Sequence, residues 1–407
     1  MIMFNDEILQ EVAPKPFKVK YNRVHMNEII LDKNYGDSFW INDVLDILGK
    51  GNYIASKFRQ KNLGVFIDLK NSQPTDNSVI SFLECVVYYF IDHLNLKVKI
   101  NHNFDRKIQT NDSRHTPLLF LRKDKPDFES FKIEFLKSNS YMQKFDRGSG
   151  LLFHKIVSWE EYNKSKKVTS ALSQDLYILF GNNTDLGWEK ASLLTETITE
   201  LVENSLEHAE ADCVLTIDIT NPNYHFMDDN SKSLFGLNIS LINFSKVKFS
   251  DKVKSRMNSS LEGLSEDSKN KYELIRQAHK VHEVQFSDTY GENSFATLAS
   301  LQHGITGRVG AQSTGGTGLT TLVKNLQLFA EKDGCYIFSG DCGFIFKKEL
   351  LGYGKNGLVG LNEDNDFMNN IPDKNILLGS KSEKIEFPGT LYNLAFVFES
   401  LREENNG

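Results

Sequence analysis

The stretch Glu200-Leu-Val-Glu203-Asn204-Ser-Leu-Glu207-His208-Ala209 places a carboxylate, an amide and an imidazole four residues apart in an otherwise apolar segment. At 3.6 residues per turn, Glu200, Asn204 and His208 lie on one stripe of a helix. The core-facing side is apolar: Ile198, Leu201, Val202 and Leu206. An Asn oxygen is a neutral ligand suited to a hydrated Mg²⁺ that carries nucleotide phosphates, and a Glu one turn earlier can act as a base. Taken alone, the stretch is equally typical of a solvated helix face.

A glycine-rich segment, Gln312-Ser-Thr314-Gly315-Gly316-Thr317-Gly318-Leu319, leads into residues with the apolar spacing of a helix. Glycines let the backbone adopt positive φ and approach a ligand closely, and the start of the next helix offers free amides to phosphate. The segment predicts an anion-binding loop, with these candidate residues: Thr314, Gly315, Gly316, Thr317, Gly318 and Leu319. It is not a Walker loop, because no Lys-Ser or Lys-Thr follows the glycines, and a flexible linker has the same composition.

Near the carboxyl end, Phe387-Pro-Gly389-Thr390-Leu-Tyr begins a segment with the apolar pattern of a strand. The three elements, in this order, resemble the GHKL superfamily of ATPases, which has an N box on a helix, a glycine-rich G2 box and a Gly-Thr step in its G3 box. The superfamily includes the ATPase domains of gyrase and Hsp90, sensor histidine kinases and anti-sigma-factor serine kinases. The resemblance covers about residues 170 to 400.

The resemblance implies a Bergerat-type α/β domain that binds ATP and Mg²⁺, with a mostly antiparallel sheet and helices on one face. Asn204 would be the Mg²⁺ ligand and Glu200 the general base. His208 shares their stripe and is expected among the cofactor-binding residues, and Thr390 would lie near the adenine. Three residues match the core of the phosphate loop: Gly316, Gly318 and Leu319. The stretch quoted first is most similar to the N box of the anti-sigma kinases.

The family's G1 box, an Asp-x-Gly-x-Gly after a strand, has no full counterpart in this chain. The matching strand is Leu237-Asn-Ile-Ser-Leu-Ile-Asn243-Phe-Ser-Lys, so Asn243 is the candidate for accepting the adenine amino group. An Asn oxygen is a neutral and weaker acceptor than a carboxylate. We therefore expect low affinity for ATP, or binding of another base, or a pocket that holds the fold without turnover.

The first 150 residues predict a different α/β region. Leu63-Gly-Val-Phe-Ile-Asp-Leu is typical of a buried strand, residues 78–94 of a helix and Leu96-Lys-Val-Lys-Ile of a second strand, which makes one βαβ unit. Residues 60 to 105 resemble STAS domains, which are substrates or partners of anti-sigma kinases, although a strand ending in Asp-Leu is common in any α/β domain. The phosphorylatable residue of a STAS domain would be Thr75 or Ser78.

The predicted organisation has three parts. Residues 1–150 form a STAS-like or other small α/β domain, residues 151–168 a linker, and residues 169–407 the ATP-binding domain with a long lid insertion at about 246–312. In the lid, Lys252, Lys254, Arg256 or Arg308 could reach the phosphates. The resemblance also implies a homodimer, because the N-terminal segment swaps between protomers in several GHKL families.

Composition excludes several other classes of protein. The chain has 407 residues, 40% of them hydrophobic, and no apolar run approaches the roughly 18 residues of a membrane span. Its start lacks a secretory pattern, and its four cysteines have no CxxC spacing, so we expect a cytoplasmic protein with buried free thiols. The net charge of -7 argues against nucleic-acid binding.

Two further patterns have simple interpretations. His279-x-x-His282-Glu283, with His303 nearby, could bind a metal, but no fourth ligand has a suitable spacing and a solvated helix face is expected instead. Gly49-Lys-Gly-Asn is too short for a phosphate loop and is expected to be a turn.

The predicted function is Mg²⁺-dependent ATP binding with slow hydrolysis, which switches a conformation or a protein contact in a bacterial-type regulatory system. Two alternatives remain open at this point. One is a serine/threonine protein kinase of the anti-sigma type, in which Glu200 deprotonates a partner's hydroxyl. The other is an inactive GHKL scaffold that only binds a protein partner or a second copy of the chain.

Overall fold

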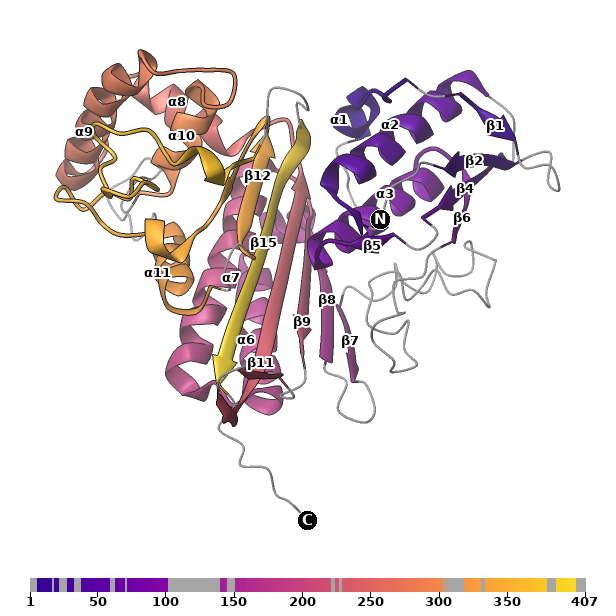
Figure 1. Cartoon of the computed structure of the whole chain (residues 1–407), viewed down its shortest axis with the longest axis horizontal. Coiled ribbons are helices and arrows are strands. Elements are labelled where there is room, and N and C mark those ends of the chain that lie inside the picture. The colour runs from indigo at the N-terminus through magenta and orange to yellow at the C-terminus, as the bar shows by residue number, and fades with distance from the viewer. Residues whose placement is uncertain are drawn as a thin grey trace. The chain divides into compact units, whose positions relative to one another are not determined.

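The computed structural model describes residues 6–16, 18–21, 28–32, 38–58, 63–69, 72–101, 140–144, 151–220, 224–226, 229–302, 305, 318–330, 334–378 and 386–399. Helices and strands mix along the chain and the sheets include antiparallel pairs, which agrees with the predicted α/β class (Figure 1). Within these ranges, no helix combines the length and the apolar character needed to cross a membrane.

Two compact units interleave along the chain. The first comprises residues 1–158, 211–218 and 239–244, and the second comprises residues 159–210, 219–238 and 245–407. The range 151–168, expected as a linker, contains the buried strand β8 (Leu151–Val157) and the helix α5 (Trp159–Lys164). The predicted division into one domain of residues 1–150 and another of residues 169–407 stays a prediction.

The first unit contains a small sheet with the strand order β1-β2-β4-β6. Strands β2 and β4 and strands β4 and β6 pair in parallel, with Val65 opposite Val98, whereas β1 is antiparallel to β2. Parallel neighbours need a crossover, and α3 provides it between β4 and β6, which confirms the predicted βαβ unit. The helices and strands of residues 6–101 in this unit are α1 (Asp6–Glu11), β1 (Lys20–Tyr21), β2 (Glu28–Asp32), β3 (Ser38–Phe39), α2 (Ile41–Lys57), β4 (Gly64–Asp68), β5 (Gln73–Pro74), α3 (Asn77–Asp92) and β6 (Lys97–Asn101).

The expected turn at Gly49-Lys-Gly-Asn is wrong, because these residues lie inside α2. The glycines permit close packing: a Cβ at Gly49 would lie 2.6 Å from the Ala13 backbone, and a Cβ at Gly51 would overlap the Phe90 ring. Between them, Lys50 is buried and pairs with Asp46 at 2.8 Å. The glycines are therefore contact points of a helix rather than turn residues.

Gly51→Ala should destabilise the protein, because its new methyl group would overlap the Phe90 ring. Overpacking of this kind costs about 1–3 kcal/mol. The matched control is Gly181→Ala in α6 (Lys167–Asn183), where a Cβ would meet nothing within 4 Å. There, the higher helix propensity of Ala should stabilise the protein by about 0.5–1 kcal/mol. Urea unfolding measures both, and equal effects of the two variants would contradict the packing argument.

The larger sheet has the strand order β14-β13-β12-β15-β11-β9-β8-β7, and β10 pairs with β11. The pairs β7–β8, β10–β11, β12–β13, β12–β15 and β13–β14 are antiparallel. The strand predicted to begin at Phe387 is confirmed as β15. The strands other than β8 are β7 (Ser140–Lys144), β9 (Cys213–Ile219), β10 (Tyr224–Phe226), β11 (Asp229–Phe244), β12 (Tyr336–Gly340), β13 (Cys342–Ile345), β14 (Leu377–Leu378) and β15 (Phe387–Glu399).

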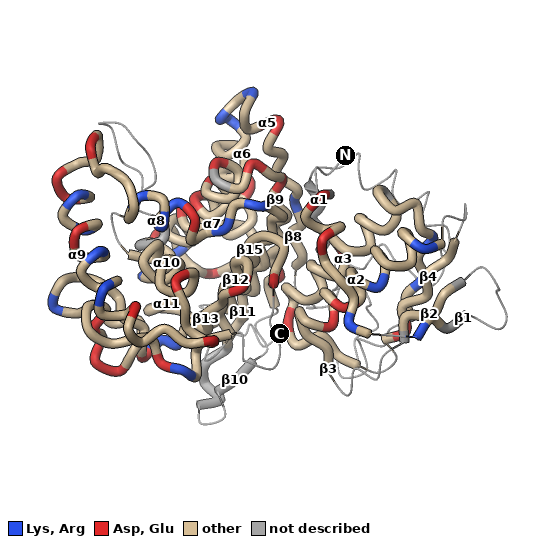
Figure 2. The backbone as a smooth tube through the Cα atoms, turned by 90° about the horizontal axis from the view of Figure 1, so that it is seen from above, with Lys and Arg blue, Asp and Glu red and all other residues tan. Residues whose placement is uncertain are grey.

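The second unit contains most of the helices. Helices α6 and α7 lie on one face of β12 and β15 (Figures 1 and 2), α7 contacts both α6 and α11, and α11 contacts β15. The described part of the segment after β11, expected as a lid, contains three helices. The remaining helices are α7 (Gly187–Ala209), α8 (Phe249–Met257), α9 (Glu266–Glu283), α10 (Glu292–Ser300) and α11 (Gly318–Phe329).

Candidate functional site

Helix α7 carries the stripe from which the sequence analysis began. Its predicted inner face is confirmed, because four side chains are almost fully buried: Ile198, Leu201, Val202 and Leu206. Glu200 and Asn204 are half-buried on the other side of the helix. The amide of Asn204 makes no hydrogen bond to any residue that the structure describes. The side chain of His208 lies outside the described residues.

The carboxyl end of α7 meets the end of β11 and the start of β15. Ser245, which lies two residues after Asn243, donates its hydroxyl proton to the Ala209 carbonyl at 2.8 Å. Its backbone N–H donates to the Pro388 carbonyl at 3.2 Å. Three segments that the sequence analysis had singled out separately are therefore joined at Ser245.

Helix α11 runs antiparallel to α7. The Lys190 ammonium lies 5.8 Å from the centre of the Phe329 ring. Four residues earlier on α11, the Asn325 amide donates to the Thr197 hydroxyl at 2.6 Å, at a point further along α7. Moving towards the start of one helix therefore means moving towards the end of the other.

This direction places the first turn of α11 at the level of Asn204. Gly318 lies seven residues before Asn325, and Asn204 lies seven residues after Thr197. At a rise of 1.5 Å per residue, each step is about 10.5 Å along its helix, in the same direction. The candidate loop residues Thr314, Gly315, Gly316 and Thr317 lie outside the described residues. Gly318 and Leu319 are the first two residues of α11, and the structure does not describe the Leu319 side chain.

Thr390, the residue of the Gly-Thr step, is buried on β15. Its hydroxyl lies 3.1 Å from the hydroxyl of Ser339, at the end of β12. The Ser339 hydroxyl also accepts a hydrogen bond of 2.9 Å from the backbone N–H of Phe249, the first residue of α8. Thr390 is thus linked to the first helix of the expected lid through one side chain.

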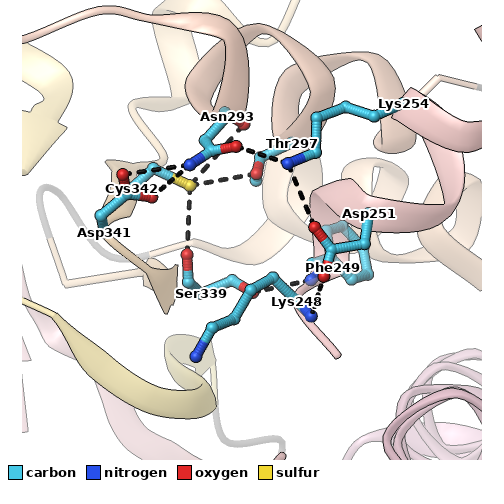
Figure 3. A network of polar contacts seen from close by, with 9 residues as sticks. All are labelled: Lys248, Phe249, Asp251, Lys254, Asn293, Thr297, Ser339, Asp341 and Cys342. Carbon is cyan, nitrogen blue, oxygen red and sulfur yellow. Dashed lines mark hydrogen bonds and ion pairs between the residues drawn. The ribbon is translucent and has the colours of Figure 1, made fainter. Parts of the chain in front are cut away.

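The linkage extends into a polar network around the β12–β13 turn (Figure 3). The Cys342 thiol donates to the Ser339 carbonyl at 3.2 Å and lies 3.0 Å from the Thr297 hydroxyl of α10. Burial raises the pKa of Cys342 to about 12, so the thiol stays protonated and unreactive. The Asn293 amide of α10 donates to both carboxylate oxygens of Asp341, at 2.8 and 3.0 Å.

Lys254, a candidate for contacting phosphates, is bound within this network. Its ammonium donates to the Asn293 side-chain oxygen at 2.7 Å and lies 3.1 Å from an Asp251 carboxylate oxygen. The other Asp251 oxygen accepts from the Lys248 backbone N–H at 2.7 Å, which caps α8. Contact between Lys254 and a phosphate would therefore require these bonds to break. Arg308 lies outside the described residues.

The expectation that the histidines of α9 lie on a solvated face is wrong for His282. Its side chain is fully buried, with one ring nitrogen 2.6 Å from the Tyr290 hydroxyl and the other 2.8 Å from the Phe367 carbonyl. Burial lowers the pKa of His282. Both nitrogens are already bonded, so the residue serves the core. No group of three or more His, Cys, Asp or Glu residues that could hold a metal occurs in the described part of the chain.

The candidate residues of the first unit differ in exposure. Asn243 is buried near the end of β11. Thr75 is exposed just before α3, whereas Ser78 is fully buried and donates to the Asp76 carboxylate at 2.6 Å. Asp76 also accepts the N–H groups of Ser78 and Val79, and so caps α3. As a phosphoacceptor, Ser78 would have to leave this cap, which leaves Thr75 as the accessible position of the two.

The first unit also holds a buried polar cluster that sequence reasoning missed. His154 Nδ1 on β8 lies 2.9 Å from the Thr216 hydroxyl of β9, which also accepts from Ser81 of α3 at 3.3 Å. The other His154 nitrogen lies 3.9 Å from a carboxylate oxygen of Glu84. Neither Glu84 oxygen has a hydrogen-bond partner among the described residues. A lone Glu in the apolar run of α3 was the available signal.

Burial shifts both ionisable groups of this cluster towards their neutral forms. It raises the pKa of Glu84 well above its usual range and lowers the pKa of His154 to about 4. Both shifts disfavour the charged forms, so burial acts against an ion pair across the 3.9 Å contact. Nearby on α3, the Asn77 amide donates to Asp218 at 3.0 Å, while burial raises the pKa of that carboxyl to about 6.

All four cysteines are buried free thiols, as expected: Cys85, Cys213, Cys335 and Cys342. Asn204 is the candidate oxygen ligand for a cation on α7. A single neutral protein ligand suits a hydrated Mg²⁺, which takes its other ligands from water and phosphate. No protein-family model matches the chain, and comparison with curated proteins and with solved structures also found no match.

Proposed function

We propose that this protein binds Mg²⁺-ATP between α7, α11 and β15 and hydrolyses it slowly to switch a conformation or a protein contact. The antiparallel contact of α7 with α11 carries the proposal. It puts the amide end of a helix that follows a glycine-rich loop at the level of Asn204, whose half-buried amide has no partner among the described residues. A helix start and a neutral oxygen ligand together suit a phosphate that carries a cation.

Each residue would have one task. The start of α11 and the glycines before it would bind the phosphates with backbone amides, and Asn204 would provide one oxygen to Mg²⁺. When bound, Mg²⁺ supplies charge neutralisation at the phosphates. Glu200, one turn before Asn204, would accept a proton from the attacking water. The water oxygen would bond to the γ-phosphorus while the bond between the γ-phosphorus and the ADP oxygen breaks. The products are ADP and phosphate.

The link from Thr390 to α8 suggests how occupancy would be transmitted. Thr390 contacts Ser339, and Ser339 accepts from Phe249 at the start of α8. A base that competed for the Thr390 hydroxyl would alter this chain of bonds, and α8 is in turn joined to α10 through Lys254 and Asn293. The helices after β11 are therefore the proposed moving part, and a partner would bind there when they change position.

Asn204→Ala should remove most of the gain in ATP affinity that Mg²⁺ provides. Loss of a ligand or of the order around it costs about 10- to 100-fold in metal affinity. Calorimetric titration of ATP with and without Mg²⁺ measures this gain. Asn204→Asp is the control, because a carboxylate keeps a hard oxygen at the same position and should retain the Mg²⁺ dependence. If Asn204→Ala bound Mg²⁺-ATP as the wild type does, the site would not be on this face of α7.

A further inference from the structure

The interface between α7 and α11 contains apolar side chains and one buried amide. Apolar side chains from both helices are fully buried there: Leu194, Ile198, Leu322 and Leu326. Among them, Asn325 is also fully buried. Its amide nitrogen donates to the Thr197 hydroxyl at 2.6 Å and to the Leu193 carbonyl at 3.3 Å. The Thr197 hydroxyl donates to the same Leu193 carbonyl at 3.0 Å, so three groups close a small ring.

Asn325 is a costly residue for this position. Its side-chain oxygen is buried without a hydrogen-bond partner among the described residues. A buried polar group that is only partly satisfied loses free energy, and replacing it with an apolar side chain of similar size is often neutral or stabilising. Stability therefore does not explain the amide, whereas directional specificity does.

The amide specifies how far α11 can slide along α7. Apolar contacts between helices tolerate different relative positions, because they have no direction. Displacement by one turn, about 5.4 Å, would separate the Asn325 nitrogen from both of its acceptors and leave it unpaired. Buried polar residues that fix the register of packed helices are the best-attested use of such groups.

We propose that Asn325 is a positioning residue that sets the distance between the phosphate end of α11 and the Glu200–Asn204 face of α7. Its contact on α7, Thr197, lies one turn before Glu200, and Asn325 lies two turns after Gly318. The single amide thus fixes both halves of the site at once. The register does not depend on the ligand, whereas the effect on nucleotide binding rests on the proposed function.

The register is tested directly by spin-label distances. Labels are attached at Glu189→Cys and Lys324→Cys, two exposed positions near the start of α7 and on α11. Pulsed electron resonance then measures their separation in the full chain. Asn325→Leu should broaden or shift the distance distribution, by up to about one helical turn of 5.4 Å. The matched control is Asn393→Leu, which removes another buried amide. Asn393 lies on β15 and donates to the Gly334 carbonyl. This variant should leave the distance distribution unchanged.

The consequence for the site is tested by titration of the same variants with Mg²⁺-ATP. Asn325→Leu should bind about 10- to 100-fold more weakly than the wild type, with little change in thermal midpoint. Asn393→Leu should bind as the wild type does. If wild type does not bind Mg²⁺-ATP, the proposed function fails while the distances still decide the register. If the Asn325→Leu distances match the wild type, or if the distances change while its binding does not, the positioning role is overturned.

Discussion

Glu200→Ala is expected to reduce phosphate release from ATP by about 10²- to 10⁴-fold, the usual contribution of a general base. Nucleotide binding should survive, because the phosphates would be bound by the start of α11 and by Asn204. Glu200→Gln keeps the size of the side chain and its ability to accept hydrogen bonds but cannot take a proton. It should be as inactive as Glu200→Ala if the carboxylate acts as a base, and intermediate if the carboxylate only orients the water.

Glu203→Ala is the matched control for this experiment. Glu203 is a half-buried carboxylate on the same helix, three residues after Glu200. Its removal should leave phosphate release within a few-fold of wild type if the Glu200 carboxylate alone acts as the base. If Glu203→Ala and Glu200→Ala lost activity equally, the loss would come from damage to α7 and not from removal of a base.

The same assay separates hydrolysis from the two alternatives. If purified wild type releases no phosphate but transfers it from γ-labelled ATP to Ser or Thr of a protein, the kinase interpretation replaces the ATPase. Thr75 is then the first position to examine, since Ser78 is fully buried. If Mg²⁺-ATP binds and neither phosphate release nor transfer occurs, the domain acts as a nucleotide-dependent scaffold.

The sequence predicted those elements whose apolar pattern has a clear period. The buried face of α7, with Ile198, Leu201 and Leu206, follows from helical spacing alone. The pair β4 and β6 around α3 follows from two apolar runs on either side of a helical pattern, and the two strands pair in parallel. Such patterns indicate which side chains are buried, and the burial of these side chains determines where the helices and strands form.

Other elements could not be predicted because contacts with residues distant in the sequence determine their structure. Gly49 and Gly51 are turn-forming residues by local preference, but contacts with the backbone of Ala13 and with the Phe90 ring place them within a helix. His282 lies on a polar helix, and later parts of the chain, including Tyr290 and Phe367, bury it. Local propensity is a weak prior where tertiary contacts are strong.

The candidate site shows the same division. Glu200 and Asn204 were predicted to share a face because they are four residues apart. Asn325 was not predicted, because only the crossing of two helices from different parts of the chain reveals its acceptors on α7. The buried group of Glu84, His154 and Thr216 also comes from three separate elements, so no sequence spacing indicates it.

Glu84→Gln is expected to stabilise the protein increasingly as pH rises. Burial raises the pKa of Glu84 well above its ordinary value of 4.5, so the folded protein keeps a proton that the unfolded chain loses. The wild type therefore loses stability as pH rises from 4.5 towards the folded pKa, at about 1.4 kcal/mol per pH unit. Glutamine has no proton to lose, and the gap between the two proteins should widen by that amount.

The neighbouring groups bend both pH curves but cancel in their difference. His154, with a pKa lowered from 6.5 to about 4, costs stability as pH falls below 6.5. Asp218, with a pKa raised from 3.8 to about 6, costs stability as pH rises towards 6. Both groups are present in wild type and variant, so their direct contributions cancel in the free-energy difference from urea unfolding. Above about pH 7, His154 is neutral in both the folded and the unfolded states, and that difference isolates Glu84.

The control for the pH experiment is Glu160→Gln. Glu160 is fully exposed, and its hydrogen bond to Lys164 lowers its pKa, the opposite direction to Glu84. Its curve should run parallel to that of the wild type above about pH 5, because Glu160 is then ionised in both the folded and the unfolded states. If the Glu84→Gln curve were also parallel to the wild type, the folded protein would bind no extra proton at Glu84. The carboxylate would then have to be ionised in the interior, paired with a protonated His154.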